Sequence, residues 1–214
     1  MRNKPLLIIV VGILAIGLGI GLGQYFMPEG EPAKPQIGGI FLVPAKPVVD
    51  FTLSQQANQP FTLADLKGHW SLLYFGYTFC PDVCPTTLTT LNRAMALLAK
   101  QGQDKDVAVW MVSVDPQRDS LEKLKEYTAF FNPKFRGATG ERGEIDKLAK
   151  EFGVYYQIHK PEPGSDYYLV DHSAAIIVIN PQGELQAVLT DTGSADKLAS
   201  DLLSIKGYFE KARS

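Results

Sequence analysis

The chain has 214 residues, of which 45% are hydrophobic, and a formal net charge of −2 at pH 7. A chain without a basic surplus is not expected to bind the phosphates of nucleic acid. Its length allows a domain with an ordinary core, and its two cysteines lie too close together in the sequence to stabilise that domain by constraining the unfolded chain.

The first 25 residues predict a membrane anchor. Arg2 and Lys4 precede an uncharged apolar run over residues 6–23, which is 18 residues long, about the length that crosses a bilayer core. We interpret residues 1–25 as a single transmembrane helix with its N-terminus in the cytoplasm and the rest of the chain exported. A cleaved signal peptide is the alternative, because glycines end the run. In either case we expect a disulfide-permissive compartment. The N-terminus is not an Arg- and Ser-rich amphipathic presequence, so it fits a bacterial inner membrane and periplasm better than a mitochondrial precursor.

Residues 26–47 predict an extended tether. The stretch from Pro28 to Pro47 contains five prolines and several glycines and has little periodicity, which is typical of a linker. The remaining residues, 48–214, contain no internal repeat, and we expect them to form a single domain.

The predicted domain begins with a β-hairpin and then alternates strands and helices. The first elements expected are a hairpin over 51–53 and 61–63, a buried strand over 70–77, a helix over 86–100, a strand over 107–114, a helix over 120–131 and a strand over 135–138. A helix over 144–152, strands over 154–159, 174–179 and 184–189, and a helix over 194–208 follow. This order predicts an α/β, thioredoxin-like fold with an N-terminal β-hairpin extension.

Both cysteines lie where the first buried strand gives way to a helix. Three residues separate Cys80 from Cys84, and Pro85 suits a first helical turn, so Cys84 is predicted at or just before that turn and Cys80 in the loop. A helix N-terminus lowers the pKa of a nearby thiol, and the thiolate binds metals and attacks disulfides. A structural disulfide is the alternative. Thioredoxin-type motifs have two residues between their cysteines, so this spacing slightly disfavours a general oxidoreductase without excluding one.

His172 is the histidine that we expect near the cysteines. It precedes the buried strand over 174–179, where a thioredoxin-like fold brings the connecting loop beside the cysteine-bearing helix. A loop histidine bonded to Ser173 or to backbone is the alternative. We expect His69 and His159 to be surface or strand-end residues. Two thiolates and one imidazole suit Cu(I), and Cu(II) with a further ligand, while zinc usually takes a fourth ligand or water.

Three segments of the sequence resemble the signature blocks of the SCO/SenC family. They are Phe75–Pro85, Ser113–Asp119 and Asp171–Ser173. The resemblance covers essentially the whole exported domain and includes the N-terminal anchor. It implies a membrane-tethered, thioredoxin-fold copper protein that assembles the binuclear CuA centre of cytochrome c oxidase subunit II. Other periplasmic copper chaperones and thioredoxin-like reductants are further partners that it implies.

Carried over residue by residue, the resemblance implies that Cys80, Cys84 and His172 bind copper, as Cu(I), Cu(II) or both. The same cysteines would be the catalytic, redox-active pair of a thiol-disulfide reductase that keeps the recipient's cysteines reduced. The sequence favours a metallochaperone, because Asp171–Ser173 occupies the place where thioredoxin-type reductases have a cis-proline. A copper or redox sensor would share the same ligands. Asp115–Asp119 is expected either to support the site or to start the following helix, by a turn at Pro116 and a cap at Asp119 or Ser120.

Overall fold

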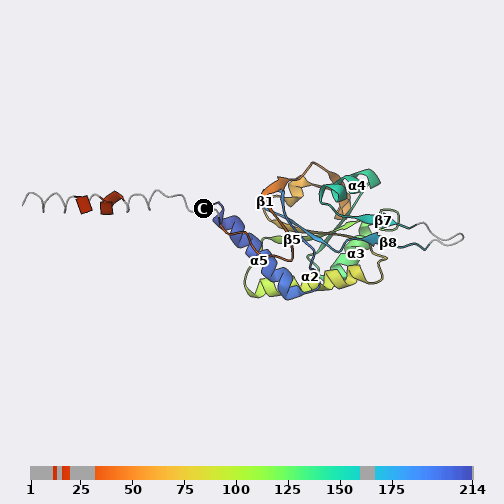
Figure 1. Ribbon diagram of the computed structural model, residues 1–214. Coiled ribbons are helices and arrows are strands. Elements are labelled where there is room, and N and C mark those ends of the chain that lie inside the picture. The colour runs from red at the N-terminus through yellow and green to blue at the C-terminus, as the bar shows by residue number, and fades with distance from the viewer. Residues whose placement is uncertain (1–11, 14–15, 20–31, 160–166, 214) are drawn as a thin grey trace, which may run out of the picture. The chain divides into compact units, whose positions relative to one another are not determined.

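A mixed sheet of eight strands lies at the centre of the computed structural model, within the unit formed by residues 34–214. The structure describes residues 12–13, 16–19, 32–159 and 167–213. The strands of this sheet are β1 (Gly39–Pro47), β2 (Thr52–Gln55), β3 (Gln59–Thr62), β4 (Trp70–Gly76), β5 (Val107–Ser113), β6 (Arg136–Thr139), β9 (Ile176–Ile179) and β10 (Glu184–Leu189). The helices are α2 (Val83–Lys100), α3 (Leu121–Phe131), α4 (Arg142–Glu151) and α5 (Ala195–Lys211). Figure 1 shows α2, α3 and α5 along one face of the sheet and α4 on the other, which confirms the predicted α/β layering.

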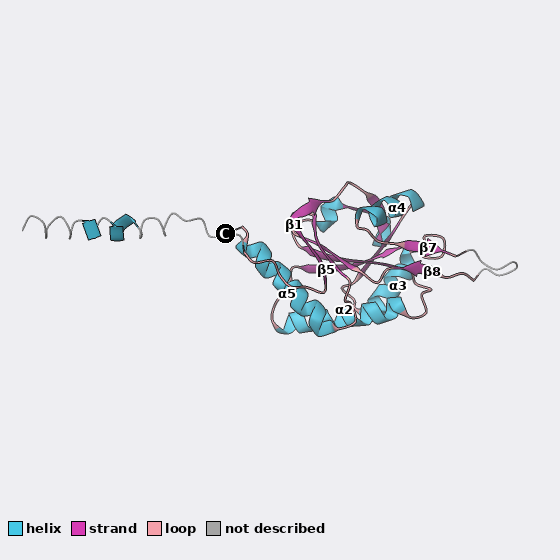
Figure 2. Cartoon of the chain, in the orientation of Figure 1, coloured by secondary structure: helices cyan, strands magenta, loops and turns pink. Residues whose placement is uncertain are grey.

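β4 and β5 lie in the middle of the sheet, whose order is β1-β10-β9-β4-β5-β6-β2-β3. Figure 2 shows the strands, in magenta, between the cyan helices. Every residue of β4 is buried. A strand covered on both faces needs no polar alternation, which explains its nearly continuous apolar sequence. Because β4, β5 and β6 are parallel to one another, their carboxyl termini lie at the same end of the sheet. The cysteine segment begins at that end, directly after β4.

The predicted N-terminal hairpin is confirmed as β2 and β3, which pair antiparallel from Thr52 and Thr62 to Gln55 and Gln59. Between the strands, Asn58 has a φ of 56°, a left-handed conformation that asparagine tolerates in turns. β2 also pairs with β6, so the hairpin extends the main sheet.

β1 corrects the predicted tether. Residues 39–47 form an edge strand antiparallel to β10, with a register shift between Phe41 and Lys46, and not a linker. The prediction of a linker rested on the prolines of this segment. Proline lacks the N–H that a central strand needs, but it is accepted on an edge strand or at an irregularity. The ring of Phe41 packs against Tyr208 of α5, with centroids 4.9 Å apart. The sheet therefore begins before residue 48.

Most of the predicted anchor, residues 1–25, lies outside the described residues. The structure assigns helix to residues 12–13 and 16–19 within it. In the part of the chain that the structure describes, no helix is both long enough and apolar enough to cross a membrane. The transmembrane helix therefore stays a prediction.

A second sheet consists of two short strands, and the sequence predicts only the first of them. β7 (Tyr156–Ile158) corresponds to the strand expected over 154–159, but its antiparallel partner β8 (Val170–His172) was not expected. In this pairing Tyr156 lies opposite His172. β8 therefore determines where the histidine of interest is placed.

Candidate metal centre

The junction between β4 and α2 places both cysteines. α2 begins at Val83, so Cys84 lies in its first turn as predicted and is fully buried, whereas Cys80 lies in the preceding loop and is partly exposed. The backbone N–H of Cys84 donates to the Sγ atom of Cys80 at 3.4 Å. At the end of β4, a Cβ atom on Gly76 would come within 2.8 Å of the Cys84 Sγ atom. The glycine therefore leaves the space that this sulfur occupies.

His172 points toward the cysteines from the end of β8. Its Nε2 atom lies 3.2 Å from the Sγ atom of Cys84. The imidazole also makes edge contacts with the rings of Tyr74 and Tyr77, whose centroids are 5.9 and 5.7 Å away. Its Nδ1 atom lies 3.3 Å from the carbonyl oxygen of Ser173. In the tautomer with the proton on Nδ1, that group donates to the carbonyl and the lone pair of Nε2 faces the cysteines. This is the usual arrangement of a histidine that binds a metal through Nε2.

The ligand atoms of Cys80, Cys84 and His172 all lie within 4.8 Å of one another. Bonds of about 2.0–2.3 Å from a metal to nitrogen and sulfur place the donor atoms of one ion about 3.5–4 Å apart. The three side chains therefore fit one ion after small rotations. Within the described ranges they are the only group of three or more histidine, cysteine or acidic residues so arranged, and their predicted proximity is confirmed.

The two thiols differ in acidity. The pKa of Cys80 is lowered to about 3. The hydrogen bond from the Cys84 thiol is the largest cause, hydrogen bonds from His172 and backbone N–H groups add to it, and together they outweigh the effect of partial burial. Burial raises the pKa of Cys84, and the hydrogen bond to Cys80 adds to that effect. The lowered pKa expected beside a helix N-terminus therefore belongs to Cys80 alone. Of the two thiols, Cys80 is therefore both the more acidic and the less buried.

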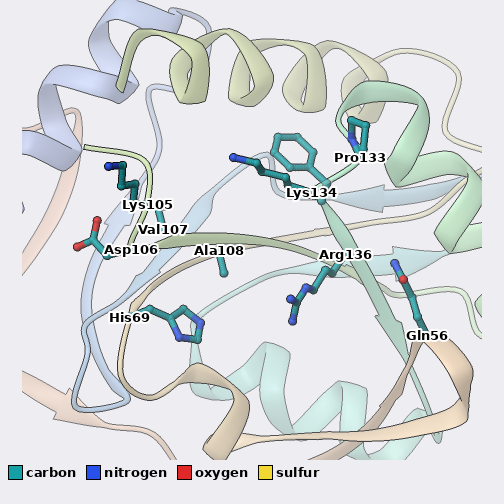
Figure 3. A pocket seen from close by; sticks show the side chains of 10 residues that line it. Gln56, His69, Lys105, Asp106, Val107, Ala108, Pro133, Lys134 and Arg136 are labelled. Carbon is teal, nitrogen blue, oxygen red and sulfur yellow. The ribbon is translucent and has the colours of Figure 1, made fainter. Parts of the chain in front are cut away.

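The other two histidines lie away from this group. His69 precedes β4 and lines a pocket of about 480 Å³ together with Arg136 and other residues (Figure 3). Strands β4, β5 and β6 begin at that end of the sheet, whereas the cysteines follow the opposite end of β4. His159 directly follows β7, and its Nε2 atom is 2.7 Å from the Oδ2 atom of Asp171 in β8.

The segment Asp115–Asp119 lies beside the cysteine loop, as the supporting role required. The carboxylate of Asp119 accepts hydrogen bonds from the backbone N–H and the hydroxyl of Thr78, at 3.0 and 2.6 Å. The helix-starting alternative is also confirmed, because α3 is capped by Ser120, whose hydroxyl accepts from the N–H of Lys123. The cap is Ser120 and not Asp119, whose carboxylate holds the loop that leads to Cys80.

Comparison with known proteins identifies close relatives. A family model described as SCO1/SenC matches residues 44–207. The chain is 31% identical over 186 residues to a SCO2-like protein of Rickettsia felis, covering 86% of this chain and 90% of the relative. It is 32% identical over 201 residues to protein sco1 of Schizosaccharomyces pombe, covering 87% of this chain and 72% of the relative.

Solved structures share the fold. Apo Sco1 of Thermus thermophilus is 38% identical, with a TM-score of 0.70 over 81% of this chain and 99% of that one. ScoI of Arabidopsis thaliana, solved with copper bound, is 32% identical, with a TM-score of 0.67 over 76% and 98% of the two chains. BsSco, described as a cytochrome c oxidase assembly protein with a disulfide switch, is 25% identical, with a TM-score of 0.59 over 79% and 98%. The predicted thioredoxin-like α/β fold is confirmed.

Proposed function

The chain belongs to the SCO1/SenC family, and on that basis we propose that it is a copper metallochaperone that loads the CuA centre of cytochrome c oxidase subunit II. The observation that carries this proposal is the convergence of Cys80, Cys84 and His172 within 4.8 Å at one end of the sheet. Soft sulfur donors together with an imidazole favour copper among the metals available to an exported protein. Three protein ligands leave room for a ligand of the recipient to enter.

The unequal exposure of the two sulfurs gives a route for release. Cys80 is partly exposed, while Cys84 is fully buried and His172 contacts two tyrosine rings. A thiolate of the recipient can therefore replace Cys80 first, while the other two residues still hold the copper. Binding requires that Cys84 lose its proton, so copper loading releases a proton to solvent.

A second function is favoured by the lowered pKa of Cys80. A thiolate that is accessible at neutral pH can attack a disulfide of the recipient, forming a mixed disulfide and releasing one recipient thiolate. The thiol of Cys84 then loses its proton and attacks the sulfur of Cys80. This step releases the second recipient thiolate and leaves a Cys80–Cys84 disulfide, so two electrons pass to the recipient. Copper and the disulfide use the same sulfurs and exclude each other.

A transfer assay separates the two functions. The copper-loaded protein is mixed with a soluble subunit II fragment whose cysteines are already reduced, and the visible and EPR spectra of the fragment are followed. We expect copper to appear in the fragment, because no reduction is needed there and only a carrier can act. No copper transfer, together with reduction of an oxidised fragment by the metal-free protein, would replace the carrier by the reductase. The His172→Ala variant is the matched control for the reductase reaction, because it keeps both thiols.

We further propose that residues 1–25 anchor the protein in a bacterial inner membrane, with the copper site in the periplasm. An anchor acts by confinement, since it raises the effective concentration near a membrane-bound recipient. A periplasmic form that begins at Lys34, exported by an unrelated cleaved signal, should therefore bind copper like the full chain but support about tenfold less oxidase activity at equal abundance. Oxidase activity in membranes and protein abundance by immunoblot measure this. Equal activity of the two forms would contradict the anchor.

A further inference from the structure

We propose that Arg118 is a positioning residue that holds the β7–β8 sheet against the cysteine loop and so keeps His172 beside Cys84. Only the effect of Arg118 on metal binding rests on the proposed copper site. Its effect on the position of β8 can be measured in the metal-free protein.

The β7–β8 sheet cannot hold its own position. It has two strands of three residues each and is separate from the main sheet. An isolated two-stranded sheet is marginally stable at best in water, so contacts with the rest of the domain must fix it. Wherever these contacts hold β8, they also hold the imidazole of His172.

Arg118 supplies such contacts through Tyr168, which lies just before β8. Its Nη1 group donates to the carbonyl oxygen of Tyr168 at 2.9 Å, and its Cζ atom lies 3.5 Å from the centroid of the tyrosine ring. The fully buried Asp115 completes the arrangement. It accepts from the Nε group of Arg118 at 2.5 Å and from the hydroxyl of Tyr168 at 2.7 Å. One buried ion pair thus holds both the backbone and the side chain of Tyr168.

The same guanidinium faces the cysteine loop. The Cζ atom of Arg118 lies 4.9 Å from the ring centroid of Phe79, the residue next to Cys80, and 5.6 Å from that of Tyr77. The hydroxyl of Tyr77 in turn accepts from the backbone N–H of Val170 in β8, at 3.2 Å. Arg118 therefore contacts both segments that carry the candidate ligands.

The cysteine loop has its own attachment and does not depend on Arg118. The buried carboxylate of Asp119 holds Thr78 through two hydrogen bonds and accepts a third from the hydroxyl of Ser113 at 2.6 Å. Removing the Arg118 side chain should therefore release β8 while Cys80 and Cys84 keep their places. The two sulfurs can still bind Cu(I), but Cu(II) loses the imidazole that it needs.

The test compares Arg118→Ala with the wild-type full chain in detergent micelles. In the metal-free, reduced protein, we expect hydrogen exchange of residues 168–172 to become about tenfold faster or more, while exchange in α2 is unchanged. After copper loading, Cu(II) should dissociate about tenfold faster and lose nitrogen hyperfine structure in its EPR spectrum, with Cu(I) affinity retained within about threefold. Tyr168→Phe, which removes only the hydroxyl, should shift the same quantities in the same direction by less.

Lys123→Ala is the matched control. Lys123 also places a cation over the ring of Phe79, at 4.3 Å, and it donates to the backbone carbonyl of Arg118 at 2.9 Å, which Arg118→Ala retains, but among the described residues it makes no hydrogen bond to Tyr168. It should leave exchange in β8 and Cu(II) dissociation unchanged. Wild-type exchange in β8 of the Arg118→Ala protein would overturn the proposal. So would faster exchange throughout the domain with equal losses of Cu(I) and Cu(II), since that would make Arg118 a residue of general stability. If the wild-type protein binds no copper, the proposed function fails, and the exchange measurement still decides the positioning role.

Discussion

Replacing Cys80 and Cys84 together by serine is expected to abolish copper binding. Both soft donors are lost, and a hydroxyl neither ionises at neutral pH nor matches sulfur as a ligand for Cu(I). Loss of outer-shell partners alone costs about 10–100-fold in metal affinity, so loss of two direct ligands should exceed about a hundredfold. Competition titration of Cu(I) and the charge-transfer absorption of bound Cu(II) measure the effect.

The fold of the double variant should be retained, which keeps the result interpretable. Cys80 is partly exposed, and serine is only slightly smaller than the buried cysteine in the first turn of α2. A circular dichroism spectrum and thermal unfolding curve like those of the wild type are therefore expected. Undiminished copper affinity in this folded variant would show that the metal is bound elsewhere in the chain.

The positions of Cys80 and Cys84 at the start of a helix were predictable because the sequence signals for them are local. A buried strand that ends in a glycine, a proline suited to a first helical turn, and two cysteines between them specify a strand-to-helix junction without reference to distant residues. The unequal acidity of the thiols was not predictable. It depends on the full burial of Cys84, which is set by the packing of α2 against the sheet.

The position of His172 required the topology of the fold as well as the motif. Topology predicted that its loop would approach the helix, but β8 spans only three residues, too few to show a periodicity. The ion pair of Arg118 with Asp115 is local in sequence, but its role at β8 is not, because the carbonyl of Tyr168 that it contacts lies 50 residues further along the chain. For β1 the local signal was present but misleading. Its prolines predict a linker, whereas in the structure the segment pairs with β10 as a strand.

Replacing His172 by alanine is expected to separate the two oxidation states of copper. The two sulfurs of Cys80 and Cys84 remain within reach of one ion, and Cu(I) is satisfied by two soft donors, so measurable Cu(I) binding should persist. Cu(II) prefers nitrogen and a larger number of donors, so its stable complex should be lost, with a drop in affinity of more than about a hundredfold. Titration of each ion separately, with thiols counted before and after, gives both affinities and excludes oxidation to the disulfide as the cause.

His159→Ala provides the matched control for this result. His159 directly follows β7 and pairs with Asp171, but the structure places it outside the group of three donors. Its replacement should leave both affinities near the wild-type values, whereas His172→Ala should affect Cu(II) far more than Cu(I). If His172→Ala keeps wild-type Cu(II) affinity and His159→Ala does not, the third ligand is His159. If both variants keep the wild-type Cu(II) affinity, the third donor is His69 or a carboxylate. The 3.2 Å contact between His172 and Cys84 is then a hydrogen bond to the thiol and not part of a metal site.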